Sequence, residues 1–573
     1  MAIRKSQPVW FSPKGASDAI DNTNVFDGAC SNLSNLIPDA TTKDIWTCRP
    51  ASILKTSFPG FTTPGFVSTL FIVGNIAYGM IATGRNAGHD EPFSYNILSN
   101  TFNTITGVTA ANTPVSPATT GAWTPPTMAL IGAKIIVTHP GFNFAGGFAF
   151  GVLDTTTPTA PTWTATNTAT NALPALPSWV ENFNQRAWFL VNIPNGQPGA
   201  YFTKSLDPLT IVNATDVLTF DDNAQLTVAA GLALFNQLGG IIQSLMIFKG
   251  AANVYQITGD SATTNLSRNS LNVATGTLSP LSVTNTPRGL TFMAPDGLRI
   301  IDFTARISDP IGVDGEGINA PFIFSVVPSR VQAASNQNVL RISVQNGLAA
   351  GSPTQEFWYD ISRKKWSGPH TFPASMISAY GNTFLMTPIT PSTSVPIVGS
   401  LWQSDVTQSS TSTFVENGAQ MTFNLTTGVL PDQKQMSEMC VVESTINLRL
   451  GPGQVVGATA LDQNMAVLNS VILMGAGAST LWDQFQWGQA LWGGPQNALA
   501  HYFLPWTKPI VFSRLQVQFT GNSTSGFKIG DAFLRYQKLG YIQFDPSVMK
   551  ASSVKEAFVL GQSHLGDPNA PLG

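Results

Sequence analysis

The sequence predicts an all-β protein in which an irregular β-propeller is followed by a C-terminal region that resembles a β-sandwich. The first observation behind this prediction is the composition. The 573 residues include 50 glycines and 39 prolines, and only 11% are charged, against about 25% in an ordinary globular protein. Gly, Pro and β-branched residues weaken helices. The mixture therefore favours short strands joined by tight turns.

The second observation is a motif that occurs twice, at residues 93–102 and 357–366. Both copies read aromatic, any residue, Tyr, Asn or Asp, Ile, four residues, aromatic, and residues 148–152 form a weaker version. A recurring strand and polar turn predicts a radial β-array, because one such unit cannot bury its apolar face alone. We expect Asn96 and Asp360 to be strand-end residues and not parts of a duplicated active site.

Strand–turn–strand patterns recur from residue 66 to residue 405. Gly74-Asn75 separates two apolar runs and suits a type II′ turn, and Pro295-Asp296-Gly297 separates two more. The patterns are roughly 45 to 65 residues apart, near the length of a kelch-type blade. About six irregular four-stranded blades would fit. A pair of packed β-sandwiches would show the same alternation and remains an alternative.

A chain of this length exceeds one hydrophobic core, so several domains are expected. A Ser/Thr-rich stretch, residues 404–418, separates the propeller from residues 515–519, which alternate as a half-exposed sandwich strand does. We predict four parts: an extended N-terminal segment with the first strands at 1–65, which wraps a neighbouring chain, the propeller at 66–405, a β-sandwich-like domain at 406–547 and a C-terminal arm at 548–573.

The charge balance argues against tight nucleic-acid binding. The 29 Lys and Arg residues and 32 Asp and Glu residues give a net charge of −3, and no basic run exceeds residues 363–365. Tight binding needs a concentrated basic surface that displaces counterions. Weak or transient contact with DNA remains compatible with this composition.

We expect no membrane span and no secretory signal. Residues 227–248 lack charge and approach transmembrane length. Their polar amides and the Gly239-Gly240 pair instead favour two buried strands around a turn. Arg4 and Lys5 are not followed by the apolar region of a signal peptide.

The sequence contains no recognisable catalytic, metal-binding or cofactor-binding motif. The three cysteines are too scattered for a disulfide framework or a zinc site, and we expect buried thiols. The five histidines form no pair at metal-ligand spacing. Most carboxylates, such as Asp222, Asp260 and Asp296, fall in predicted turns. His89-Asp90-Glu91 is the densest polar group, and we interpret it as a solvated loop, with a divalent-ion site as the alternative.

Residues 482–492, here named the tryptophan loop, contain Trp482, Trp487 and Trp492. A spacing of five residues fits neither a helix nor a strand. Indole rings bury a large area at low entropic cost, so they serve cores, protein interfaces and carbohydrate platforms. All three interpretations stay open for this loop.

The order of several short segments resembles the tail nozzle proteins of short-tailed bacteriophages, a family that includes packaged-DNA stabilisation proteins. The tryptophan loop is similar to that family's tryptophan-repeat loop. The other matching segments are residues 35–39 with Trp46 and Arg49-Pro50, the central signature at residues 254–260, the hairpin at residues 295–298 and the closing hairpin at residues 527–541.

The resemblance implies a structural virion protein without catalysis. Such proteins form a ring, expected to be a hexamer, below the portal and the head-to-tail adaptor. The ring extends the DNA channel, retains the packaged genome and passes it during ejection. The implied partners are further copies of the chain, the adaptor, tail fibres or spikes, a needle or plug, and double-stranded DNA in the lumen. The implied location is the tail of the virion, after synthesis in the host cytoplasm.

Two regions are candidates for contact with other subunits or the adaptor. They are the N-terminal segment, with Trp46 and Arg49, and the tryptophan loop, with Trp482, Trp487 and Trp492. The competing hypothesis is a kelch-like propeller of a virion or cell surface that binds or degrades carbohydrate. An acidic pair in a pocket would favour that hypothesis.

Overall fold

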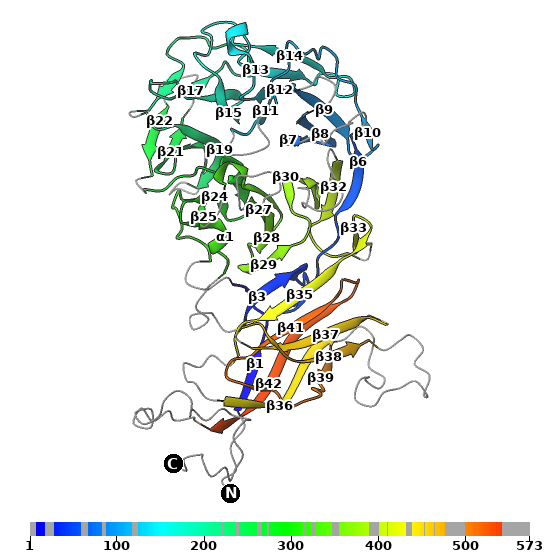
Figure 1. Ribbon diagram of the computed structural model, residues 1–573. Helices are drawn as coiled ribbons and strands as arrows, with labels where there is room; N and C mark the ends of the chain where they lie inside the picture. Colours follow the sequence, from blue (N-terminus) through cyan, green and yellow to red (C-terminus); the bar gives the residue numbers. More distant parts are fainter. Residues whose placement is uncertain are drawn as a thin grey trace, which may run out of the picture.

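The computed structural model places a ring of β-sheets above a smaller pair of packed sheets (Figure 1). It describes residues 7–17, 28–58, 67–82, 88–116, 124–220, 223–235, 240–259, 266–271, 274–312, 317–323, 327–345, 354–388, 400–409, 411–430, 438–451, 453–462, 464–475 and 499–540. The fold class is therefore the predicted one, a β-propeller followed by a β-sandwich.

Among the described residues, five four-stranded sheets, one three-stranded sheet and four strands of a larger sheet, β26–β29, follow one another around the ring. The first blade contains β7 (Val67–Val73), β8 (Ile76–Ala82), β9 (Asp90–Asn96) and β10 (Thr101–Phe102). The second contains β11 (Thr127–Ile131), β12 (Lys134–Thr138), β13 (Phe150–Asp154) and β14 (Thr162–Thr166). The third contains β15 (Pro177–Phe183), β16 (Arg186–Val191), β17 (Gly199–Phe202) and β18 (Val217–Thr219).

The ring continues with β19 (Leu226–Phe235), β20 (Ile241–Lys249), β21 (Asn253–Thr258) and β22 (Ser267–Ser270), then the three-stranded sheet β23 (Thr284–Thr286), β24 (Gly289–Ala294) and β25 (Gly297–Ile301). The next blade contains β26 (Gln332–Asn336), β27 (Val339–Gln345), β28 (Thr354–Asp360) and β29 (Lys365–His370). The first three strands of the last blade are β30 (Ala374–Tyr380), β31 (Thr383–Pro388) and β32 (Ser400–Asp405). In the described part of the chain, a short helix, α1 (Ala320–Ile323), and the 3₁₀ turns Phe144–Gly146, Pro280–Ser282 and Pro328–Arg330 lie between strands.

The first strands of most neighbouring sheets pack against each other, and β30 packs against β7 to close the ring. The fourth blade contacts the three-stranded sheet through buried side chains, such as Phe248 of β20 and Phe292 of β24. The fourth strand of the last blade is β6 (Ile53–Ser57), which pairs with β32 through Leu54 and Trp402. A strand from before the ring therefore joins its last blade. This arrangement removes an open sheet edge at the point of closure.

Two predicted turns have the expected geometry. Val73 pairs with Ile76 across Gly74-Asn75, and Gly74 has a φ of +58°, as the first central position of a type II′ turn requires. Ala294 pairs with Gly297 across the Pro295-Asp296 turn. The uncharged stretch around residues 227–248 forms the antiparallel strands β19 and β20, as predicted.

The repeated motif is the hairpin between the third and fourth strands of two blades. Asn96 pairs with Thr101 in one blade, and Asp360 pairs with Lys365 in the other. Both side chains stabilise the turn that follows, because their Oδ1 atoms accept backbone N–H groups two or three residues on. The weaker copy at residues 148–152 falls on β13, where Asp154 takes the strand-end position.

The sandwich contains strands from both ends of the chain. One sheet has the order β39 (Ala500–Phe503), β36 (Glu438–Arg449), β42 (Lys528–Gly540), β5 (Trp46–Cys48) and β4 (Leu36–Pro38), with β1 (Gln7–Phe11) on β42 and β40 (Val511–Phe512) on β36. The other has the order β3 (Ala29–Ser34), β35 (Thr422–Thr427), β41 (Gln516–Asn522), β37 (Val455–Leu461) and β38 (Val467–Met474), with β2 (Gly15–Ala16) on β3. A hairpin of β33 (Val415–Glu416) and β34 (Ala419–Gln420) lies nearby.

The propeller and the sandwich share a sheet and a core. Leu33 of β3 bridges to Gly368 of β29, so the sheet of β26–β29 continues into the sandwich. One apolar cluster includes Phe357 and Trp366 of the propeller as well as Phe423 and Phe527 of the sandwich. The two parts are thus joined by backbone pairing and by buried side chains.

The N-terminal region differs from the prediction of a segment that wraps a neighbouring chain. Its described strands are built into both domains of the same chain, β1–β5 into the sandwich and β6 into the last blade. The predicted C-terminal arm at residues 548–573 lies outside the described residues. Within the described part of the chain, no helix is both long and apolar enough to cross a membrane.

Candidate functional site

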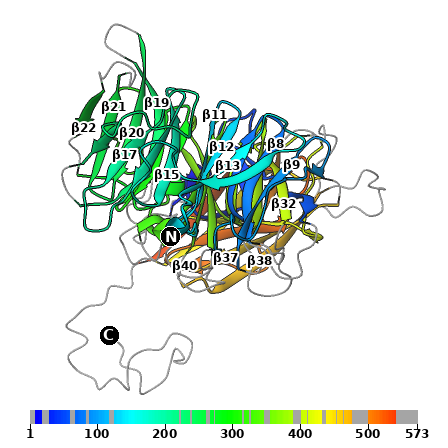
Figure 2. The same cartoon turned by 90° about the horizontal axis from the view of Figure 1, so that it is seen from above.

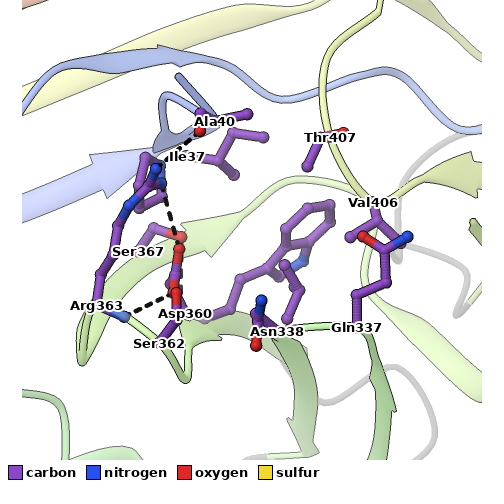
Figure 3. Close-up of a pocket in the computed structure, with 13 residues that line it drawn as sticks. Ile37, Ala40, Gln337, Asn338, Asp360, Ser362, Arg363, Ser367, Val406 and Thr407 are labelled. Carbon is purple, nitrogen blue, oxygen red and sulfur yellow. Dashed lines mark hydrogen bonds and ion pairs between the residues drawn. The ribbon is translucent and has the colours of Figure 1, made fainter. Parts of the chain in front are cut away.

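A pocket of about 210 Å³ lies where the propeller meets the sandwich (Figure 3). Its walls come from the β26–β27 and β28–β29 turns, from the N-terminal segment after β4 and from the chain just after β32. The residues that line it are Ile37, Pro38, Ala40, Gln337, Asn338, Val339, Trp358, Asp360, Ser362, Arg363, Ser367, Val406 and Thr407.

The polar wall of the pocket is the turn of the second motif copy. The Asp360 carboxylate accepts hydrogen bonds from the Ser362 hydroxyl at 2.7 Å and the Arg363 backbone N–H at 2.9 Å. The Arg363 guanidinium lies 3.4 Å from the same carboxylate and donates to the Ala40 carbonyl at 3.1 Å (Figure 3). These charges therefore tie the blade to the N-terminal segment.

Two further ion pairs hold the same junction. Lys365 of β29 contacts Asp44 at 2.6 Å, and Lys528 of β42 contacts Asp39 at 2.6 Å. Partial burial of the Asp39 carboxyl raises its pKa. Hydrogen bonds from Lys528 and Thr41 outweigh this effect and lower the pKa of Asp39 to about 2. Asp39 is thus an anion that fixes the loop between β4 and β5 to the sandwich.

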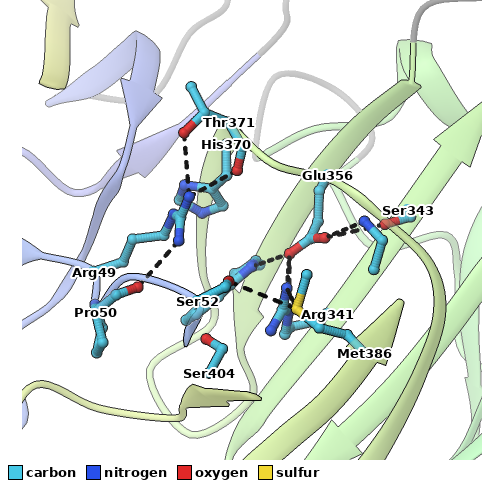
Figure 4. Close-up of polar contacts among 12 residues, drawn as sticks. Arg49, Pro50, Ser52, Arg341, Ser343, Glu356, His370, Thr371, Met386 and Ser404 are labelled. Atoms are coloured by element: carbon cyan, nitrogen blue, oxygen red, sulfur yellow. Dashed lines mark hydrogen bonds and ion pairs between the residues drawn. The ribbon is translucent and has the colours of Figure 1, made fainter. Parts of the chain in front are cut away.

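A network of buried charged and polar side chains (Figure 4) contacts Trp358 and Ser367 of the pocket. Arg49 and Glu416 form a bidentate pair with distances of 3.0 and 2.8 Å, and the Ser52 backbone N–H donates to the same carboxylate at 2.9 Å. Arg49 also donates to the Asn35 side chain and to the Thr371 carbonyl. One guanidinium therefore links the N-terminal segment, the propeller and the β33 hairpin.

The second pair of the network is inside the propeller. Glu356 of β28 accepts from the Arg341 guanidinium at 2.8 Å and from the Trp358 indole at 2.6 Å. Its second carboxylate oxygen accepts from Ser343 and from the backbone N–H of Ala374. The Arg341 side chain also stacks over Trp358. The Glu356 carboxylate thereby joins β28 of one blade to the start of β30 in the next blade.

His370 lies between the two arginines as a neutral imidazole. Its Nδ1 accepts the Asn35 backbone N–H at 3.0 Å, and its Nε2 lies 3.1 Å from the Ser367 hydroxyl. Burial, together with the positive charges of Arg49 and Arg341, lowers the pKa of His370 well below 6.5. His370 therefore has a structural role, because its protonation would place a third cation beside Arg49 and Arg341.

The interface candidates of the N-terminal segment are wrong. Trp46 has an exposed fraction of 0%, and its indole donates to the Pro13 carbonyl at 2.7 Å. Arg49 has an exposed fraction of 2% and is enclosed by the network. Neither side chain can reach another subunit, because the chain's own strands cover it. Trp482, Trp487 and Trp492 lie outside the described residues, so their assignment stays a prediction.

The His89-Asp90-Glu91 group is not the solvated loop that we expected. Asp90 is fully buried in β9, where it contacts His139 Nε2 at 3.0 Å and accepts from the Ser68 hydroxyl at 2.7 Å. Within the described part of the chain, no three His, Cys, Asp or Glu side chains could together hold a metal ion. Cys30 and Cys48 are buried free thiols, as predicted, and Cys440 is half-buried.

Sequence reasoning missed Arg341, Glu356 and Glu416. A usable signal exists for Glu356, because it is a charged residue in the interior of an aromatic-rich strand, whereas the strand's other charged residue, Asp360, is at the strand end. An ionised side chain in a buried strand requires a partner. Glu416 has no such local signal, because its partner Arg49 is 367 residues away in the sequence.

No family model matches this sequence, and no curated protein matches it either. Solved structures with distant similarity include puromycin hydrolase, at 9% identity and a TM-score of 0.33, covering 66% of this chain and 62% of the hydrolase. The β-propeller domain of the trilobed protease from Pyrococcus furiosus matches at 7% identity and a TM-score of 0.31, covering 60% of this chain and 96% of that domain. SapL1 lectin, solved with α-methyl fucoside, matches at 14% identity and a TM-score of 0.29, covering 53% and 95%. At these identities and TM-scores the similarity says nothing about activity.

Proposed function

We propose that the chain is a structural subunit of the tail nozzle of a short-tailed bacteriophage. Copies form a ring that extends the DNA channel below the portal and adaptor, retains the packaged DNA and passes it during ejection. The observation that carries the proposal is the junction between the two domains. Most of the charged side chains near the pocket are engaged with internal partners, which suits a rigid building block.

The junction supports a structural role because it couples the domains in three independent ways. The sheet of β26–β29 continues into the sandwich through β3. The Arg49–Glu416 pair connects both domains to the N-terminal segment. A strand from that segment, β6, completes the last blade. Buried ion pairs of this type fix one geometry rather than add net stability.

The segments behind the family resemblance occupy scaffold positions. Residues 254–258 belong to β21, residues 295–296 form the turn before β25, and residues 528–540 form β42. A sequence pattern at strand and turn positions reflects the requirements of folding. The proposed role requires no catalytic group, in keeping with this placement.

The charge of the chain suits a channel through which DNA slides. A net charge of −3 spread over 573 residues offers few cations for phosphate contacts. Weak contact keeps the DNA mobile, whereas a strongly basic lumen would hold it.

A second candidate function is carbohydrate binding by the propeller. A groove of about 670 Å³ lies between the third and fourth blades. It is lined by Asn182, Phe183, Asn184, Gln185, Arg186, Ser205, Gly231 and Gln243. Side-chain amides such as these can bind sugar hydroxyls. The buried Phe183 provides no open aromatic face, so we favour the structural role.

Analytical ultracentrifugation with a glycan array tests the two candidates together. The nozzle proposal predicts concentration-dependent assembly to a closed species of about six copies, no glycan binding and only weak DNA binding. A chain that stays monomeric and binds or cleaves a defined glycan would refute the proposal and support the second candidate.

A further inference from the structure

Positive charge gathers at the junction between the propeller and the sandwich, although the whole chain has a net charge of −3. Lys365 of β29 directly follows two more cations of the β28–β29 turn, residues 363–364. A hydrogen bond from Lys365 lowers the pKa of Asp44, and the charges of Lys43 and Lys14 lower it further. The N-terminal segment therefore brings two more cations to the same turn.

The neighbouring three-stranded sheet adds a further cation. Arg288 lies in the turn between β23 and β24, and its side chain hydrogen-bonds to Tyr359 of β28. Tyr359 directly precedes Asp360, the last residue of β28. The exposed Arg288 side chain therefore lies beside the β28–β29 turn as well.

Only some of these cations are compensated. The ion pairs of the junction, described above, neutralise the cations that are closest to the pocket. Lys14, Lys43 and Lys364 are exposed, and within the described residues none of them forms an ion pair. The junction thus presents a surplus of positive charge to solvent.

This surface offers charge without an aromatic anchor. The ammonium group of Lys365 lies 5.8 Å from the centre of the Trp46 ring, and Tyr359 packs on Trp366. All three aromatic side chains are buried. Protein interfaces depend on aromatic anchors that reach the partner, whereas contacts with a nucleic-acid backbone need only accessible Lys and Arg. The surface therefore fits phosphate groups better than it fits an acidic protein.

We infer that the exposed residues Lys14, Lys43, Arg288 and Lys364, here named the basic cluster, contact the phosphates of duplex DNA. The inference rests on the proposed nozzle function, and it assigns the junction to the side of each subunit that faces the channel. A few cations on each subunit give binding that is weak, independent of base sequence and sensitive to salt. Such contact leaves the DNA free to slide, because phosphate contacts carry no sequence information.

Neutralisation of two lysines of the basic cluster tests this assignment. Fluorescence anisotropy with a short labelled DNA duplex measures the affinity between about 50 and about 200 mM salt. In Lys43→Gln with Lys364→Gln, the slope of log affinity against log salt should become shallower by about 2, because each lost phosphate contact removes about 0.9. Both side chains are exposed, so thermal unfolding and sedimentation should match the wild type.

The matched control is Lys204→Gln with Lys508→Gln, which changes the net charge equally at two exposed lysines. Lys204 follows β17, which lies across the ring from β29 in Figure 1 and away from the sandwich strands β37 and β38 in Figure 2. The Lys508 carbonyl accepts from Asn469 of β38, at the opposite edge of the sandwich sheet from β3. The control should keep the slope of the wild type.

The outcomes separate this inference from the nozzle proposal. If the wild type forms closed rings but the cluster variant and the control have equal slopes, only the inference is wrong. If the wild type stays monomeric while the cluster variant alone loses salt dependence, the nozzle proposal is wrong and the phosphate contact is confirmed. Poly-glutamate that displaces the duplex better than unlabelled DNA does, at equal charge concentration, would assign the surface to an acidic protein and overturn the inference.

Discussion

Removal of the Glu416 carboxylate should destabilise both domains. In Glu416→Ala, the Arg49 guanidinium loses two hydrogen bonds, of 3.0 and 2.8 Å, and the Ser52 backbone N–H loses one of 2.9 Å. The exposed fractions of the two charged side chains are 2% and 6%, so water cannot replace the carboxylate. An uncompensated buried charge costs about 3–5 kcal/mol.

Urea unfolding followed by tryptophan fluorescence measures this loss. The control is Glu443→Ala, which breaks the half-exposed pair with Arg535 and should cost less than about 1 kcal/mol. The double variant Arg49→Met with Glu416→Met removes both charges, so it should lose much less than the two single variants combined. A loss below about 1 kcal/mol for Glu416→Ala would refute the network as the clamp between the domains.

Two further predictions follow from the structure, and a third follows from the sequence. Deletion of residues 1–50 should prevent folding of the sandwich, seen as lost cooperative unfolding, because it removes β1–β5; a folded but assembly-deficient product would contradict this. His370 has a lowered pKa, so its contribution to stability is complete above pH 6.5 and is lost as the pH falls below that value. Urea unfolding should show a smaller fall in the free energy of unfolding for His370→Asn than for the wild type between about pH 7.5 and about pH 5. The control His501→Asn, at an exposed histidine, should show the same fall as the wild type. Alanine at all three positions of the tryptophan loop should unfold the sandwich if the indoles serve its core, and should spare folding but weaken assembly if they form an interface.

Local features of the fold could be predicted from the sequence. The Gly74-Asn75 turn depends on the backbone freedom of one glycine, and the motif turns depend on Asn96 and Asp360, which bond to residues only two or three positions away. Preferences that act between residues two or three positions apart can be recognised in a short stretch of sequence. They sufficed to predict the propeller and its hairpins.

Long-range features could not be predicted in this way. β6 joins β32 across almost the whole ring, and β3 bridges two domains through a single residue pair. Asp90 looked like a loop residue because its partner His139 is 49 residues further along the chain. Trp46 and Arg49 looked like interface residues because their covering strands come from distant segments. Such contacts depend on the closed topology, which no local pattern encodes.

Electron microscopy of the purified chain tests the central claim most directly. The nozzle proposal predicts closed particles with about six-fold symmetry and an axial opening wide enough for duplex DNA. Dispersed monomers at every concentration, together with binding or hydrolysis of glycans by those monomers, would contradict it.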